Sequence, residues 1–134
     1  MASVPSVDVM DETFLAVPPA VVAAEFAAPA QWPRLWPDLH LQVMADRGDE
    51  GMRWTVLGAL VGSMEVWLEP VLDGTVLHYY LRADPPGPDG HPRPASPRRA
   101  AAEVRRRRRA AKAIAFACKQ RLEAGREPGE PPRR

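Results

Sequence analysis

The chain of 134 residues has little cysteine and no long uninterrupted apolar run. Cys118 is the only cysteine, which excludes an internal disulfide framework and favours a reducing, cytoplasmic location. The first seventeen residues carry three acids and no Lys or Arg, so a secretory signal is not expected. The apolar stretch 14–30 contains three prolines and Glu25, which argues against a membrane span.

Motifs for metal, cofactor or nucleophilic chemistry are also missing. The three histidines and Cys118 lack metal-ligand spacing, and no glycine-rich phosphate loop is present, so neither a metal nor a cofactor is predicted. Cys118 falls in an apolar helical stripe, which predicts a buried structural thiol rather than a nucleophile. His40 and His78 fall on the outward faces of predicted strands, where solvated positions are expected. No catalytic residue is named, and enzymatic activity is left open.

The net charge of +1 hides an uneven distribution. Residues 1–90 hold 4 basic and 13 acidic side chains, whereas residues 91–134 hold 14 basic and 4 acidic ones. Such a split predicts either a basic segment for an anionic partner or two parts of one protein that attract each other.

Apolar residues alternate with polar ones through the middle of the chain. This period of two predicts strands over 39–46, 52–57, 63–69 and 76–82, each with one apolar face. Asp73-Gly74 is a strong hairpin signal between the last two. Residues 7–16 read as a first strand, so five antiparallel strands are expected.

Helical patterns flank these strands. Pro18-Pro19 suits a helix start, and 19–28 predicts a short amphipathic helix, followed by a helical turn over 31–38. Residues 84–97 hold six prolines and predict an irregular loop.

A long helix is predicted over 98–124, with Gly125 as a C-cap and a flexible tail at 125–134. Its apolar stripe predicts that the half after Ala110 packs, while the half before it runs along the surface or beyond the sheet. The residues of the stripe are Val104, Ala111, Ile114, Ala115, Cys118 and Leu122.

This order of elements, with several short motifs, resembles the START-like (SRPBCC) superfamily of polyketide cyclases, dehydrases and lipid-transport proteins. The matching segments are Val17-Pro18-Pro19-Ala20, the run Trp32 to Asp38, Gly51-Met52-Arg53-Trp54, Val66-Trp67-Leu68-Glu69-Pro70, Asp73-Gly74-Thr75 and Leu122-Glu123. The resemblance covers most of residues 5–124, expected to form a single domain. It rests on diffuse fold signals, and the chain is shorter than the family, with about five strands instead of six or seven.

The resemblance implies an α+β helix-grip fold, in which a curved antiparallel sheet wraps around the C-terminal helix and leaves an apolar pocket between them. Periodicity supplies candidate wall residues, for which plain core packing is the alternative. These candidates are Trp36, Met52, Trp54, Val56, Met64, Val66, Leu68, Tyr79, Leu81, Ile114, Ala115 and Cys118.

The first functional hypothesis is therefore binding of a lipid, polyketide or similar apolar molecule. A dry cavity of roughly 300 Å³ would cost about 7 kcal/mol, so we expect a modest pocket that is normally occupied. The alternative is an aromatase/cyclase-type enzyme, which would need polar groups inside the pocket. Tyr79 is the only inward hydroxyl that we nominate on the strands.

A third hypothesis rests on the arginine run. Residues 98–109 contain seven arginines, including Arg105, Arg106, Arg107, Arg108 and Arg109, with Glu103 as the only acid. The run predicts either binding of nucleic acid or an anionic membrane, or pairing with the acidic sheet of the same chain.

Two further features concern charged strand residues and Phe116. Glu65, Glu69, Arg53 and Arg82 are expected to form a charge ladder, and Phe116, off the apolar stripe, a second packing surface or a dimer contact.

Overall fold

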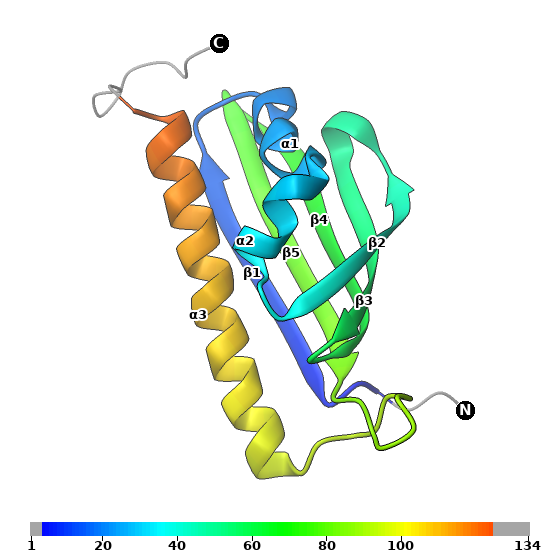
Figure 1. Ribbon diagram of the computed structural model, residues 1–134. Helices are drawn as coiled ribbons and strands as arrows, with labels where there is room; N and C mark the ends of the chain where they lie inside the picture. Colours follow the sequence, from blue (N-terminus) through cyan, green and yellow to red (C-terminus); the bar gives the residue numbers. More distant parts are fainter. Residues whose placement is uncertain (1–3, 125–134) are drawn as a thin grey trace.

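The computed structural model describes residues 4–124, which form an open, curved antiparallel sheet with helices on one side (Figure 1). The strand order is β1-β5-β4-β3-β2, which puts β1 and β2 at the two edges. The tail predicted at 125–134 lies outside the described residues. The elements are β1 (Val7–Leu15), α1 (Pro19–Ala27), η1 (Pro29–Gln31), α2 (Trp32–Leu35), β2 (Leu39–Asp46), η2 (Gly48–Glu50), β3 (Gly51–Gly58), β4 (Val61–Val71), β5 (Gly74–Asp84) and α3 (Pro97–Leu122).

The five predicted strands form, and their register explains the buried face. Met64 pairs with Trp54 on one side and with Leu81 on the other, while Val66 pairs with Tyr79. Because side chains alternate along a strand, these partners all point to the same face, which is the inner one. A register shift between Val43 and Ala45 marks an irregularity in β2 of the kind that bends a strand.

Helix α3 begins where the sequence provides a cap. The Ser96 hydroxyl accepts a hydrogen bond from the Arg99 backbone N–H at 3.3 Å, and Pro97 occupies the first turn. The helix ends at Leu122, before the C-cap predicted at Gly125, a residue outside the described range. No described helix combines the length and the apolar composition that a membrane span requires.

Helix α3 lies along the edge strand β1 (Figure 1). Lys112 Nζ donates to the Glu12 carbonyl oxygen at 3.1 Å, and Lys119 Nζ donates to the Phe14 carbonyl oxygen at 2.8 Å. These carbonyls belong to an edge strand, and no other strand of residues 4–124 lies on that side of it. The two lysines therefore fasten the helix to the sheet and cover part of its edge.

The core lies between the inner face of the sheet and the helices. Ala111, Ala115 and Cys118 of α3 are buried, and Val22 and Phe26 of α1 cover the far end of the same face. The predicted apolar stripe therefore packs as expected in the second half of α3. The α+β helix-grip architecture predicted from the sequence is confirmed.

Candidate functional site

The predicted wall residues lie on the inner face of the sheet and on the helices that cover it. Eleven of the twelve are at most 7% exposed, and Ile114 is partly buried against them. The structure thus brings them together in one layer, and some of them border hollows within it.

An aromatic cluster fills the centre of this layer. The indole of Trp36 lies nearly parallel to the ring of Tyr79, with centroids 6.5 Å apart and an interplanar angle of 10°. It also contacts Trp54 at 5.6 Å and Phe26 at 6.4 Å. Trp32 packs edge-on against Trp54 and donates its Nε1–H to the Phe26 carbonyl oxygen at 2.9 Å. The short helices α1 and α2 therefore place bulky rings where the family resemblance implies a pocket.

A small cavity remains between the sheet and α3. Its volume is about 10 Å³, close to the minimum that one water molecule needs. Five predicted residues line it, together with Asp11, Phe26, Leu77 and Ala111. These five are Trp36, Val66, Tyr79, Ile114 and Ala115.

A larger hollow, the α1 groove, lies between α1, η2 and the inner face of the sheet. Its volume is about 280 Å³, near the lower end of the range for small-molecule sites. Its lining is mainly apolar and includes the predicted residues Met52, Val66 and Leu68. The others are Ala20, Ala23, Ala24, Phe26 and Ala27 from α1 and Asp46, Gly48, Asp49 and Gly51 from the rim.

Phe26 and Val66 line both the small cavity and the α1 groove. These two side chains therefore form the partition between the small cavity and the α1 groove. The other predicted residues border neither hollow and fill the core. They are Trp54, Val56, Met64, Leu81 and Cys118.

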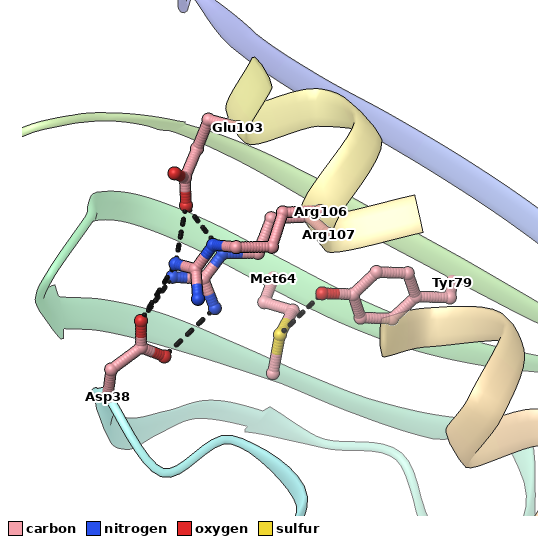
Figure 2. Close-up of polar contacts among 6 residues, drawn as sticks. All are labelled: Asp38, Met64, Tyr79, Glu103, Arg106 and Arg107. Atoms are coloured by element: carbon pink, nitrogen blue, oxygen red, sulfur yellow. Dashed lines mark hydrogen bonds and ion pairs between the residues drawn. The ribbon is translucent and has the colours of Figure 1, made fainter. Parts of the chain in front are cut away.

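The small cavity contains two polar side chains. The Tyr79 hydroxyl donates to the Met64 thioether sulfur at 3.2 Å (Figure 2), and sulfur is a weak acceptor. Burial raises the pKa of Tyr79 well above its usual value, more than nearby Arg107 lowers it, so the phenol stays protonated. The Asp11 carboxylate is held by Lys112 Nζ at 2.9 Å. The cyclase alternative requires polar groups inside the pocket. The small cavity offers two, the phenol of Tyr79 and the carboxylate of Asp11, which is paired with Lys112.

The arginine run is divided between the interior and the surface. Arg107 is only 5% exposed, and its guanidinium binds Asp38 and Glu103, while Arg106 contacts the same two carboxylates (Figure 2). The expectation that this half of α3 stays at the surface is therefore wrong for Arg107. Asp38 immediately precedes β2, and its carboxylate, 2.7 Å from Arg107 Nη2, compensates the buried charge.

The contact with Arg106 and Arg107 lowers the pKa values of both carboxylates. Burial alone would raise the pKa of Asp38, but hydrogen bonds and charge attraction from Arg107 and Arg106 outweigh it and hold the pKa below its ordinary value. The pKa of Glu103 is lowered in the same way, against burial, by hydrogen bonds from Arg106 and Arg107. The remaining arginines of the run, Arg105, Arg108 and Arg109, are exposed.

His78, on the outer face of the sheet, is not at the solvated position that the sequence predicts. This imidazole points outward but is buried, because it stacks on Trp67 at 4.3 Å and its nitrogens face two carboxylates. Nε2 is 2.9 Å from Glu69, and Nδ1 is 3.3 Å from Glu12. The prediction of a solvated His78 is wrong, since cross-strand neighbours cover it.

The predicted charge ladder has partly different partners. Glu65 pairs with Arg47 at 3.4 Å, and Arg82 pairs with Asp8 at 3.7 Å. A hollow of about 300 Å³ lies on this face, and Arg53, Glu65 and Arg82 contribute charged walls to it. It is therefore a poorer match to an apolar ligand than the α1 groove.

Cys118 is buried, as its place in the helical stripe predicts. Burial, with a smaller contribution from Glu25 and against Arg121, raises the pKa of this thiol to about 11. A protonated, inaccessible thiol is a structural residue.

Sequence reasoning missed the alanines of α1. Ala20, Ala23, Ala24 and Ala27 recur at helical spacing on a side of α1 different from that of Val22 and Phe26. Small residues at such positions leave room above a sheet, and this spacing is the signal that would have indicated the groove. Gly51, at the rim, requires glycine for a different reason: its φ is 120°, and a Cβ there would collide with the Val66 carbonyl oxygen.

Comparisons with known proteins give a consistent picture at the level of fold. No protein-family model and no curated protein matches the sequence. Among solved structures, the Aha1 dimer from Colwellia psychrerythraea is 12% identical with a TM-score of 0.61, covering 90% of this chain and 99% of that one. Mll3558 from Rhizobium loti is 15% identical with a TM-score of 0.59, covering 81% and 94%. The polyketide cyclase-like protein Cgl2372 from Corynebacterium glutamicum is 17% identical with a TM-score of 0.56, covering 97% and 98%.

An open, curved antiparallel sheet that holds a long C-terminal helix defines the helix-grip class. Within that class, the chain has the START-like (SRPBCC) fold, as the sequence resemblance implied.

Proposed function

We propose that this domain binds an apolar small molecule in the α1 groove. The observation that carries the proposal is the groove itself, about 280 Å³ bordered by alanines of α1 and by Met52, Val66 and Leu68 of the sheet. An apolar ligand placed there would remove further apolar surface from water, at about 25 cal/mol per Å².

The partition between the two hollows supports a ligand longer than the open groove. Phe26 and Val66 border both spaces, and the Phe26 ring packs against Trp36 rather than against a polar anchor. Rotation of the Phe26 side chain would join the groove to the small cavity beside Tyr79. The ligand would then lie along the inner sheet face, with its far end near the Tyr79 hydroxyl.

The test uses the full chain and the neutral apolar dye Nile red, titrated by fluorescence. We expect saturable binding that drops at least tenfold when Ala23 and Ala24 are both changed to Leu, because the larger side chains fill the groove. Leucine is a good helix former, so α1 should persist. The matched control changes Ala101 and Ala102, which are exposed on α3, to Leu.

Equal binding by the groove variant and the control would contradict the proposal. So would the absence of saturable dye binding together with no apolar molecule in a solvent extract of the protein purified from its source.

A further inference from the structure

Three exposed arginines of α3, Arg105, Arg108 and Arg109, have no carboxylate partner within the described part of the chain. Arg106 and Arg107 turn toward Asp38 and Glu103, and Glu103 is the only acid among residues 98–109. For Arg105, Arg108 and Arg109, no carboxylate of residues 4–124 lies within ion-pair distance. The run therefore contains two arginines that pair with carboxylates of the same chain and three exposed arginines that do not.

Part of this set lies in a line on the outer face of the helix. At about 100° per residue, Arg98, Arg105, Arg109 and Phe116 fall within about 40° of one another, opposite buried Ala111. Their span is about 27 Å at 1.5 Å per residue. Phe116 is 52% exposed. The helix thus presents a basic line that ends in an exposed aromatic ring, here called the α3 outer stripe.

This arrangement costs the isolated domain stability. Arg105 and Arg109 are four residues apart and Arg105 and Arg108 are three apart, spacings at which like charges repel. The first turn of α3 contains no acid, so its cations also oppose the helix macrodipole. An anionic partner would add favourable charge interactions that offset both effects.

We propose that the α3 outer stripe docks on an anionic phospholipid surface. Lipid phosphates and carboxylates supply the missing negative charge, and the exposed Phe116 ring can enter the interfacial region, where aromatic residues are favoured. The stripe is convex, and neither the α1 groove, the small cavity nor the hollow on the outer sheet face takes any of its lining from Arg98, Arg105 or Arg109. Single-stranded nucleic acid is usually held in a basic groove, so a convex stripe suits a planar surface better. This proposal is independent of the ligand in the α1 groove.

The test is co-sedimentation of the full chain with phosphatidylcholine vesicles, with and without phosphatidylserine, at several salt concentrations. We expect binding only with phosphatidylserine, and weakening as salt rises. Changing Arg98, Arg105 and Arg109 together to Gln should weaken binding roughly a hundredfold, because each basic residue contributes about fivefold at such a surface. F116S should weaken it by about tenfold, through the lost apolar contact.

The matched control changes Arg47, Arg53 and Arg82 on the outer sheet face to Gln, which alters net charge equally but leaves the α3 outer stripe intact. Circular dichroism checks that α3 persists in each variant. Three outcomes overturn the proposal. One is no binding to phosphatidylserine vesicles at low salt. Another is equal losses in the control and the stripe variant. The third is binding of a single-stranded oligonucleotide without vesicle binding, which would assign the stripe to nucleic acid.

Discussion

Asp38 accepts two parallel hydrogen bonds from the guanidinium of Arg107, at 3.0 Å from Nη1 to Oδ1 and at 2.7 Å from Nη2 to Oδ2. The two residues are 69 positions apart in sequence. Glu103 completes the arrangement by accepting from Arg107 Nε at 2.9 Å. A planar, bidentate contact of this kind fixes geometry as well as charge. It joins the start of β2 to α3, near the aromatic cluster.

Removing the Asp38 carboxylate should lower the free energy of unfolding markedly, although this side chain is partly exposed, because its partner Arg107 is buried. In Asp38→Ala, the buried Arg107 keeps only Glu103 as a partner, so we expect a loss of about 2–3 kcal/mol in the free energy of unfolding. Urea denaturation measures this loss. Asp8→Ala, which removes an exposed ion pair with Arg82 at 3.7 Å, should cost no more than about 1 kcal/mol and provides the control.

A double-mutant cycle separates this contact from general effects. Combining Asp38→Asn with Arg107→Met should recover part of the loss, because an apolar side chain of similar length needs no counter-charge. Strictly additive losses would show that Asp38 and Arg107 act independently.

Stability should fall as the pH drops through the acid range. The folded-state pKa values of Asp38 and Glu103 lie below their ordinary values of 3.8 and 4.5, so the unfolded chain takes up protons first. Their contribution is therefore complete above about pH 5 and is lost as the pH falls through the folded-state pKa values. Urea midpoints between neutral pH and pH 3 would show this, and Asp38→Asn should flatten the acid limb. An unchanged slope in that variant would rule out Asp38 as a contributor.

Replacing Phe26, which borders both hollows, by a smaller residue should lower the stability of the protein without lowering its affinity for an apolar ligand. Phe26→Ala removes a buried ring and should destabilise the protein by about 3–4 kcal/mol. It also joins the α1 groove to the space beside Trp36, so Nile red affinity should be retained or increased. Val22→Ala, which shortens a buried side chain of α1 outside the groove lining, controls for destabilisation alone.

Cys118 should resist thiol reagents in the folded protein. With a pKa of about 11, only about one thiol in a thousand is ionised at pH 8, and burial blocks access as well. We expect slow reaction with Ellman's reagent in buffer and complete labelling of one thiol per chain in urea. Fast native labelling would mean that the C-terminal half of α3 opens readily.

The strands and the long helix could be predicted because their signals are local. Alternation along β3, β4 and β5 fixes which side chains share a face, and Ser96-Pro97 marks the start of α3 within one residue of its predicted position. The inward direction of Trp54 and Tyr79 follows from the same period of two.

Other features depend on neighbours that the sequence does not reveal. A helical wheel shows that Arg107 lies on the inner side of α3, but not that Asp38 meets it there. His78 is buried because the strand register puts Glu12 and Trp67 beside it. The size of the central space depends on how the Trp36 ring is placed, which no periodicity specifies. These are long-range relationships, set by tertiary packing.

The two borders of the sheet are unequal in a way that bears on self-association. Along β1, α3 and its lysines occupy carbonyls that another strand would need, whereas no strand of residues 4–124 lies beside the outer border of β2. Two copies that joined through β2 would each use up that one border. Growth by strand addition would then stop at a pair, because no second free border would remain on either copy.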